Sequence, residues 1–222
     1  TNQQISVDKY RSKAAGYDAS AEFTMPLRRR TIALLGLKPD DVVLDVGAGT
    51  GLSYELLLRA VGPTGRVLAF EQSPDMFALA QARQNHHRWP NLWHTLASAE
   101  TVCLPQAPDA VLFNYTHDIN RSPEAVANLL NQCKPGARIA IAGIKFFPWW
   151  TGPLNLLAWA KNRPYNARPA DLWRPWSLIE ARCSSFSRQT TQWGMGYIAH
   201  GVLQGGPPPV AKSASALAPS CP

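Results

Sequence analysis

The stretch DVVLDVGAGTGLSYELL, residues 41–57, decides the fold. An apolar run reaches an acid, Asp45, three glycines follow at alternate positions (Gly47, Gly49 and Gly51), and a helical pattern then begins. A turn from a strand into a helix leaves the first N–H groups of the helix unpaired, and glycine lets a ligand approach the backbone closely. We therefore expect a ligand against this turn, and the first question is whether that ligand carries a phosphate.

The spacing of the glycines differs from that of a dinucleotide site. The dinucleotide fingerprint is G-x-G-x-x-G, in which the third glycine supports close packing of helix on strand. Here the pattern is G-x-G-x-G, and Leu52 stands where that third glycine would be. The carboxylate of Asp45 would also repel a pyrophosphate, whereas it would attract a cationic ligand directly or through water.

A second acid, Glu71, closes the next apolar run, 20 residues after Gly51. An acid at that place can accept hydrogen bonds from both hydroxyls of a ribose. The residues together predict a ligand with a ribose and an amine but no phosphate, and S-adenosylmethionine fits that description. A dinucleotide site and a plain strand-to-helix turn without a ligand remain the alternatives.

Strand-like and helix-like patterns alternate along the chain, which favours an α/β fold with a doubly wound, mostly parallel sheet and helices on both faces. The expected strands are residues 41–46, 65–71, 91–97, 109–115, 137–145, 185–193 and 197–203, and the expected helices cover 26–37, 52–61, 73–84 and 122–133. Two of these helices open with Ser-Pro, at Ser73 and Ser122, where the serine can cap and the proline suits the first turn.

The length of 222 residues suits one domain. We expect an N-terminal cap segment over residues 1–25 and the main domain over 26–203. Within that domain, residues 146–183 are rich in tryptophan and proline and read as a substrate-covering insert. Residues 204–222 are low in complexity and are expected to be a flexible tail.

The formal net charge of +7 and the pI of about 9.5 would suit an anionic partner. The simpler interpretation is that this charge keeps the protein soluble, because apart from residues 28–30 the basic residues are scattered. The N-terminal residues are polar and do not resemble a signal peptide, and the longest apolar stretch, 146–160, is interrupted by proline. We therefore expect a cytoplasmic protein that does not span a membrane.

Over roughly residues 8–203, the chain resembles the class I S-adenosylmethionine-dependent methyltransferases. VVLDVGAGTG (42–51) looks like their first motif, and the other matching segments are VLAFEQSPDM (67–76), ASAETVCLP (97–105), DAVLFNYTHDI (109–119) and CKPGARIAIAG (133–143). Within this family, the sequence pattern is most similar to the small-molecule methyltransferases of the quinone-biosynthesis and phosphatidylethanolamine types. The resemblance implies a Rossmann-like, seven-stranded sheet whose last strand, here 197–203, runs antiparallel.

The resemblance also implies which residues hold the cofactor, S-adenosylmethionine. Many relatives place an Asp where this chain has Ser98, and a hydroxyl accepts the adenine amino hydrogen more weakly than a carboxylate does. Tyr17 matches an N-terminal aromatic residue that often closes over the cofactor. The complete set of candidates is Tyr17, Asp45, Gly47, Ala48, Gly49, Glu71, Gln72, Met76, Ser98, Ala99 and Asn114.

The candidate catalytic residues are Tyr115, His117 and Asp118, just past the fourth strand, where doubly wound folds place their ligands. Methyl transfer is an in-line displacement, and the enzyme positions the acceptor and excludes water. A hydroxyl or ammonium acceptor must also lose a proton, which a histidine can take. The alternative is that Asp118 only caps a helix while His117 packs in the core.

The aromatic side chains of the insert would form an apolar hood over the acceptor, or simply pack the outer helices on the sheet. These candidate substrate-binding residues are Phe147, Trp149, Trp150, Trp159 and Trp173. Lys145 and Lys161 flank the segment and would also suit an interfacial helix in peripheral contact with a membrane. The acceptor is thus expected to be a partly apolar small molecule or lipid, methylated on oxygen, nitrogen or carbon.

Three other hypotheses stay open at this stage. One is methylation of RNA or another macromolecule, although signatures of nucleic-acid amino methylation are missing from the sequence. Another is a non-catalytic module of the same fold that binds the cofactor or a nucleic acid. The third is metalloid chemistry at Cys103, Cys133 and Cys183, although these cysteines are 30 and 50 residues apart and fall in different expected elements. No zinc site is expected, because no pair of ligands has the usual spacing.

Overall fold

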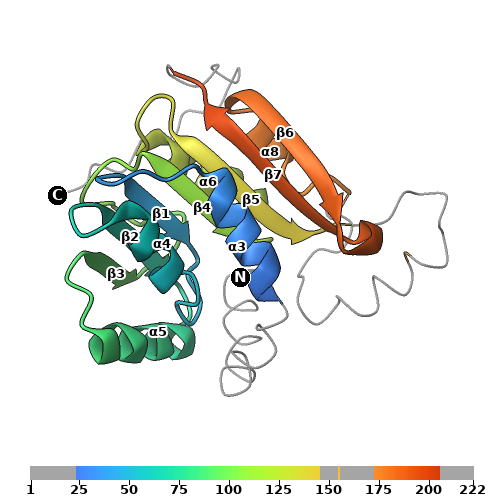
Figure 1. Cartoon of the computed structure of the whole chain (residues 1–222). Helices are drawn as coiled ribbons and strands as arrows, with labels where there is room; N and C mark the ends of the chain where they lie inside the picture. Colours follow the sequence, from blue (N-terminus) through green and yellow to red (C-terminus); the bar gives the residue numbers. More distant parts are fainter. Residues whose placement is uncertain (1–23, 146–154, 156–172, 206–222) are drawn as a thin grey trace.

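The computed structural model describes residues 24–145, 155 and 173–205. It contains one seven-stranded sheet in the order β3-β2-β1-β4-β5-β7-β6 (Figure 1). The strands are β1 (Val42–Val46), β2 (Arg66–Glu71), β3 (Leu92–Leu96), β4 (Ala110–Asn114), β5 (Arg138–Ile144), β6 (Cys183–Thr191) and β7 (Gly196–Leu203). The predicted fold class is confirmed.

Some predictions concern residues outside the described ranges. They are the N-terminal cap segment, most of the insert, the tail, and the site residues Tyr17, Phe147, Trp149, Trp150 and Trp159.

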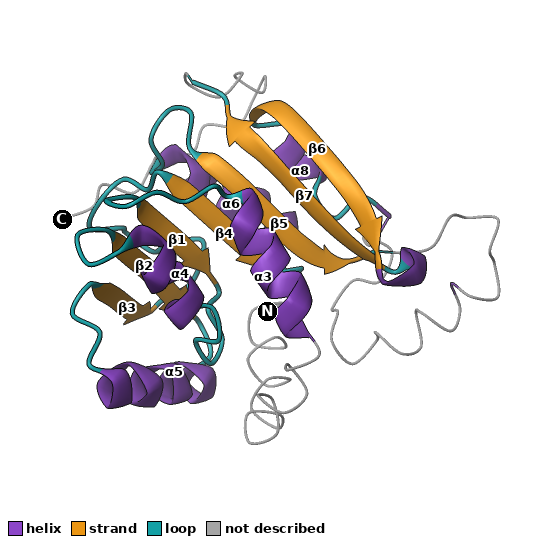
Figure 2. Cartoon of the chain, in the orientation of Figure 1, coloured by secondary structure: helices purple, strands orange, loops and turns teal. Residues whose placement is uncertain are grey.

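Helices cover both faces of the sheet (Figure 2). Side chains of α3 (Met25–Leu34), α4 (Tyr54–Val61) and α5 (Pro74–His87) pack on one face, and those of α6 (Pro123–Asn131) and α8 (Ser177–Glu180) on the other. Two short 3-10 helices complete the described elements, η2 (Ile119–Arg121) and η5 (Gln192–Gly194). Among the described residues, no helix combines the length and hydrophobicity that a membrane crossing needs.

The central strands β1 and β4 are buried along their whole length, as expected for parallel strands covered on both faces. Their polar members, Asp45 and Asn114, stand at the carboxyl ends of the two strands. The strand order reverses direction at β1, because β2 lies on one side of it and β4 on the other. Open α/β sheets bind their ligands beyond the carboxyl ends of the strands at such a point.

The prediction that residues 197–203 form an antiparallel strand is confirmed. β7 pairs antiparallel with β5 on one side and with β6 on the other, so it lies between them. Gly201 makes this close pairing feasible, since a Cβ at that position would lie 2.6 Å from the backbone oxygen of Ser185. β6 begins at Cys183, two residues earlier than expected, and ends at Thr191.

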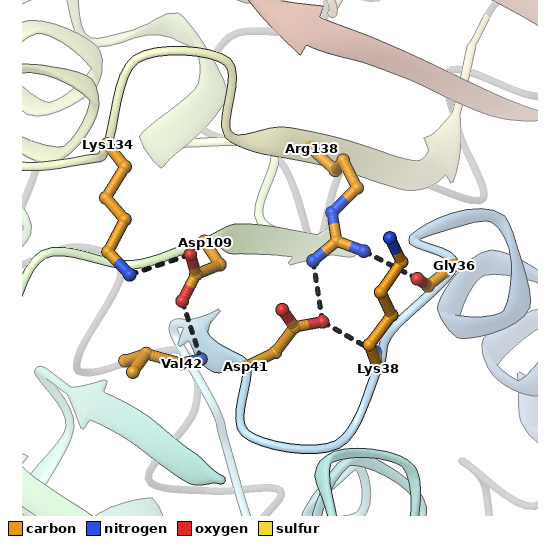
Figure 3. A network of polar contacts seen from close by, with 7 residues as sticks. All are labelled: Gly36, Lys38, Asp41, Val42, Asp109, Lys134 and Arg138. Atoms are coloured by element: carbon orange, nitrogen blue, oxygen red, sulfur yellow. Dashed lines mark hydrogen bonds and ion pairs between the residues drawn. The ribbon is translucent and has the colours of Figure 1, made fainter.

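A polar network fixes the opposite, amino-terminal edge of the sheet (Figure 3). Arg138 on β5 donates to the Asp41 carboxylate at 2.6 Å and to the Gly36 carbonyl at 2.5 Å. Asp109 accepts from the backbone N–H of Val42 at 3.0 Å and from Lys134 Nζ at 2.7 Å. These contacts tie the starts of β1, β4 and β5 together, so the carboxyl ends of the same strands are held in register.

The two Ser-Pro helix starts behave differently. The Ser122 hydroxyl caps α6 by accepting from the backbone N–H of Ala125 at 3.1 Å. Ser73 occupies the N-cap position of α5, but its hydroxyl is buried and has no hydrogen-bond partner among the described residues. The predicted side-chain cap at Ser73 is therefore wrong. Its backbone N–H instead donates to the carboxylate of Glu71, at 2.8 Å. Ser73 therefore contacts a candidate cofactor residue at the carboxyl edge of the sheet.

Candidate functional site

The glycine turn after β1 contains three glycines with left-handed backbone, and two of them have distinct surroundings. Gly47, Gly49 and Gly51 have φ of 56°, 60° and 80°, in the left-handed region that glycine adopts without strain. A Cβ at Gly51 would lie 2.5 Å from the ring of Tyr54, so this glycine permits helix α4 to pack closely. A Cβ at Gly49 would meet nothing within 4 Å. The backbone at Gly49 therefore borders open space into which a ligand can fit.

The N–H groups of this turn are largely used inside the protein. Ala48 N–H donates to the Phe70 carbonyl at 3.0 Å, and Gly51 N–H donates to the Ala48 carbonyl at 3.0 Å. Gly49 N–H donates to Oε2 of Glu71 at 2.9 Å. Phosphate sites at helix starts depend on such N–H groups facing the ligand. With these three donors engaged and a carboxylate in contact with the turn, the geometry disfavours a phosphate.

Asp45 provides a negative charge next to the turn. Its side chain is 1% exposed, and Oδ2 has no hydrogen-bond partner among the described residues. Burial raises the pKa of this carboxyl to about 7, although the charge of Arg28 and a hydrogen bond from Ser53 act in the opposite direction. A buried acid oxygen without a partner is costly, and a bound cation would remove that cost. The residues present thus fit the positively charged end of S-adenosylmethionine.

Glu71 links the turn to the end of β2. Burial raises the pKa of its carboxyl, while hydrogen bonds from the backbone of Ser73, Gly49 and Gln72 lower it. Each carboxylate oxygen can accept more than one hydrogen bond, so these backbone contacts orient the group and leave capacity for ligand hydroxyls. The carboxylate is 2.9 Å from the backbone N of Gly49, beside the open space, as a ribose-binding acid requires.

The predicted adenine-contacting segment lies next to Glu71, because Ala97 N–H donates to the Glu71 carbonyl at 3.0 Å. Ala99 and Met76 are buried, at 1% and 2% exposed. The Ser98 hydroxyl donates to the carboxylate of Glu100 and accepts from the Glu100 backbone N–H at 3.3 Å. The structure thus places the carboxylate of Glu100, which the sequence analysis did not consider, next to the Ser98 hydroxyl.

The end of β4 carries a second group of polar side chains. Asn114 is 7% exposed, and neither Oδ1 nor Nδ2 of its amide has a partner among the described residues. Tyr115 has a φ of 61°, an uncommon value for a residue with a side chain, and such backbone strain occurs often at functional sites. Its hydroxyl accepts from Nε2 of Gln192 at 3.4 Å.

His117 and Asp118 follow directly. His117 is 8% exposed, its Nε2 accepts a long hydrogen bond of 3.4 Å from the backbone N–H of Ile144, and burial lowers its pKa to about 4. Asp118 occupies the N-cap position of η2, with no capping hydrogen bond from its side chain. The structure therefore brings the three catalytic candidates and Asn114 to one edge of the sheet, as the sequence predicts.

The remaining candidates divide as follows. Of the predicted hood residues, the described part of the chain includes Trp173, whose side chain is 48% exposed. Burial raises the thiol pKa of Cys133 to about 12 and of Cys183 to about 11, which keeps both protonated at neutral pH and argues against metalloid chemistry. Among the described residues there is no group of three or more His, Cys, Asp or Glu that could hold a metal ion.

One residue of the site was missed by the sequence analysis. The sequence analysis noted the run at 28–30 only as a local cluster of basic residues, whereas the structure shows that Arg28 is 7% exposed while Arg29 and Arg30 are exposed. Nη1 of Arg28 donates to the Ser53 hydroxyl at 2.5 Å. The available signal was helical spacing, because Arg28 lies three, four and seven residues before the buried Thr31, Ile32 and Leu35, on the inward face of α3.

Comparison with known proteins agrees with this geometry. Residues 43–136 match the family model described as a methyltransferase domain. The chain is 27% identical over 117 residues to the ubiquinone/menaquinone biosynthesis C-methyltransferase UbiE of Hydrogenovibrio crunogenus, a match that covers 51% of this chain and 46% of that protein. It is 31% identical over 136 residues to the protein-L-isoaspartate O-methyltransferase of Aeropyrum pernix, covering 61% and 48%. The chain thus spans about half the length of these curated relatives.

Solved structures support the fold. A S-adenosylmethionine-dependent methyltransferase from Aquifex aeolicus superposes with a TM-score of 0.60 at 20% identity, covering 79% of this chain and 89% of that one. Together with the matching family model and curated relatives, the resemblance to S-adenosylmethionine-dependent methyltransferases is confirmed, and this resemblance implies S-adenosylmethionine as the cofactor.

Proposed function

We propose that this chain, with its methyltransferase domain at residues 43–136, transfers a methyl group from S-adenosylmethionine to a partly apolar small molecule or lipid. The observation that carries the proposal is the pair of buried carboxylates, Asp45 and Glu71, beside a glycine turn in which the N–H groups of Ala48, Gly49 and Gly51 already donate within the protein. Such a site suits a cationic nucleoside and disfavours a phosphorylated one. When bound, the cofactor supplies an electrophilic methyl group on a sulfonium.

The proposal gives the candidate site residues the following roles. Glu71 accepts the ribose hydroxyls, Asp45 faces the cationic end of the cofactor, and Met76 lines the adenine side together with the segment Ser98–Ala99–Glu100. Asn114 lies at the end of β4, between the cofactor side and the acceptor side. The similarity to a quinone-biosynthesis C-methyltransferase supports an apolar acceptor for this chain too, as does the exposed ring of Trp173.

The acceptor class is tested by labelling. The wild-type protein is incubated with S-adenosylmethionine carrying a radioactive methyl group and a fractionated cell extract, with a Glu71→Gln protein as the matched control. We expect label in the solvent-extractable small-molecule or lipid fraction with the wild type only. Label in RNA or protein would contradict the acceptor class. Cofactor binding without label in any fraction would identify a non-catalytic module of this fold.

His117 is the proposed base. Because burial lowers its pKa to about 4, the imidazole stays neutral at physiological pH and can accept a proton. The atom that accepts is Nε2, which must exchange its long hydrogen bond with Ile144 for one with the acceptor. Tyr115 and Asp118 flank the ring in sequence, and the proposal gives them the role of shaping the acceptor pocket.

If His117 is the base, His117→Ala should lower kcat by about 100-fold, the usual scale for losing general base catalysis, and leave the Kd of the cofactor unchanged. The wild-type kcat should fall only as the pH approaches 4. The matched control is His94→Ala, which removes a partly buried imidazole from β3 whose pKa is likewise lowered to about 4 by burial. A wild-type rate for His117→Ala would exclude it from the mechanism.

A further inference from the structure

A cluster of three buried polar side chains lies where the end of β5 meets the start of β7. Nδ2 of Asn120, Nε1 of Trp176 and Oη of Tyr197 have no hydrogen-bond partner among the described residues. The exposed fractions of the three residues are 1%, 5% and 1%. We call them the donor cluster. Buried polar groups are almost always hydrogen-bonded, so three such donors in one place indicate that a further group completes them.

Contacts within the described part of the chain bring these side chains together. The ring centroids of Trp176 and Tyr197 are 4.7 Å apart. Burial raises the pKa of the Tyr197 hydroxyl, and Asn120 lies near enough to that hydroxyl to lower this pKa. Oδ1 of Asn120 accepts from the Thr116 hydroxyl at 2.9 Å, so the end of the amide without a described partner is the donor Nδ2. A Cβ at Gly47 would lie 3.1 Å from Cγ2 of Thr116, which links the donor cluster to the glycine turn.

The donor cluster also lies beside the proposed base. Gly143 on β5 pairs with Tyr197 on β7, and a Cβ at Gly143 would lie 2.7 Å from Cε1 of His117 and 3.1 Å from Oη of Tyr197. The imidazole and the phenol therefore approach the same point above β5. Because Nε2 of His117 accepts from the backbone N–H of Ile144, the proton of the neutral ring is assigned to Nδ1. That atom is buried and has no partner among the described residues either.

The chemistry of these groups restricts what can complete them. An indole N–H and an amide NH2 only donate, Nδ1–H of a neutral imidazole donates, and a phenol can donate its proton. A carbonyl or ionised hydroxyl oxygen has several lone pairs and can accept from more than one of them. A protonated amine has no lone pair, so it would leave the donors unpaired and add a buried charge.

We propose that the donor cluster binds an oxygen of the methyl acceptor, so that the acceptor is an apolar compound with a carbonyl or ionised hydroxyl and not a protonated amine. The inference rests on the proposed function, and it narrows the acceptor class that the proposed function leaves open. The three side chains are binding residues that place the oxygen next to His117, and they take no part in the transfer of a proton or of the methyl group.

The test compares two probes with the same fused ring system, hydroxynaphthoquinone, which presents carbonyl oxygens and an ionised hydroxyl, and naphthylmethylamine, a protonated amine. Calorimetry on wild-type protein saturated with S-adenosylhomocysteine should give a Kd about 10- to 100-fold lower for hydroxynaphthoquinone, the scale of one or two hydrogen bonds to a charged acceptor. Tyr197→Phe keeps the ring on Trp176 and removes one donor. It should weaken hydroxynaphthoquinone binding about 10-fold and change the Kd of the amine by less than about threefold.

A second variant tests the direction of the hydrogen bonds. Asn120→Asp replaces the donor Nδ2 by an oxygen of nearly the same size, so it should weaken hydroxynaphthoquinone binding about 100-fold and reduce the ratio of the two Kd values to one or below. Tyr54→Phe is the matched control. It removes a hydroxyl that is also buried without a partner among the described residues, in the core on the opposite face of the sheet, and should preserve the wild-type ratio.

The outcomes separate this inference from the proposed function. Equal affinities of the wild type for the two probes, as expected if ordered water satisfies the donors, would overturn the inference. So would tighter binding of the amine, no binding of hydroxynaphthoquinone, or an unchanged ratio in both Tyr197→Phe and Asn120→Asp. Any of these results could occur while S-adenosylhomocysteine still binds and a methyl group is still transferred. If the wild type does not bind S-adenosylhomocysteine, the proposed function itself fails.

Discussion

Replacing Asp45 with Asn should make the ligand-free protein more stable and at the same time weaken its binding of S-adenosylmethionine by about 100-fold. The buried carboxyl has its pKa raised from 3.8 to about 7. Between these two values the folded protein binds more protons than the unfolded chain, so stability falls as the pH rises through this window. Above pH 7 the full cost is present, on the order of 4 kcal/mol for a shift of this size. Asparagine does not carry that cost.

Thermal unfolding of both proteins measures the first effect. The Asn variant should unfold at a higher temperature than the wild type at pH 8, whereas the two proteins should unfold alike at about pH 3, below both pKa values of Asp45. Asp40→Asn is the matched control, because Asp40 is exposed and its φ of 71° suits asparagine. An Asn variant that is less stable at pH 8 would contradict the assigned burial cost.

Binding measured against pH tests the second effect. A cationic ligand prefers the ionised form of Asp45, so the affinity of the wild type should rise about tenfold per unit between pH 5 and pH 7, where the ligand's own amino group stays protonated. The Asn variant should lose this pH dependence. If the wild-type affinity is flat across the window, Asp45 does not interact with the cation.

Replacing Glu71 with Gln should reduce the affinity for every adenosine ligand by about 100-fold. The carboxylate is the predicted partner of two ribose hydroxyls, and hydrogen bonds to a charged acceptor are each worth about 1.5–3 kcal/mol. The substitution also puts an NH2 group against the backbone N–H of either Gly49 or Ser73, which now donate to the two oxygens. The turn would therefore lose part of its orientation.

The distinguishing measurement uses ligands with and without the amino-acid end. S-adenosylhomocysteine and 5′-methylthioadenosine should lose affinity equally in Glu71→Gln, because both carry the ribose. In Asp45→Asn only S-adenosylhomocysteine should lose affinity. Glu55→Gln serves as the control, since it removes an acid from the exposed, surface ion pair of α4 with Arg59. Full affinity for 5′-methylthioadenosine in Glu71→Gln would mean that the ribose does not contact this acid.

The sequence was sufficient for the fold and for placing the candidate cofactor residues at one edge of the sheet, because both follow from local patterns. Alternating apolar strands and amphipathic helices predict a doubly wound sheet. The glycines of residues 47–51 and the acids at the ends of two adjacent strands are close in the chain, and the parallel arrangement brings strand ends to one edge. The parallel order of the strands alone therefore predicts one common edge of the sheet for Asp45, Glu71, Asn114 and His117.

Contacts between residues that are far apart in the sequence became known only from the tertiary structure. Arg28 and Asp45 belong to different elements, and the side chain that joins them, Ser53, lies in a third. Whether an arginine in a basic run points outward or into the core depends on which helix face packs on the sheet, and the run itself does not record it. The same holds for the backbone N–H of Gly49, which is free or engaged according to the orientation of a carboxylate 22 residues away.

Local periodicity thus determined the order of the strands and helices and the edge of the sheet that carries the proposed ligand site, since these depend on contacts between neighbours in the chain. The charge state of that place was decided only when the chain folded. Burial removes water from Asp45 and Glu71, and the long-range contact with Arg28 sets how much negative charge remains available to a ligand. Desolvation and distant charges act through space, so their sum depends on the packed structure.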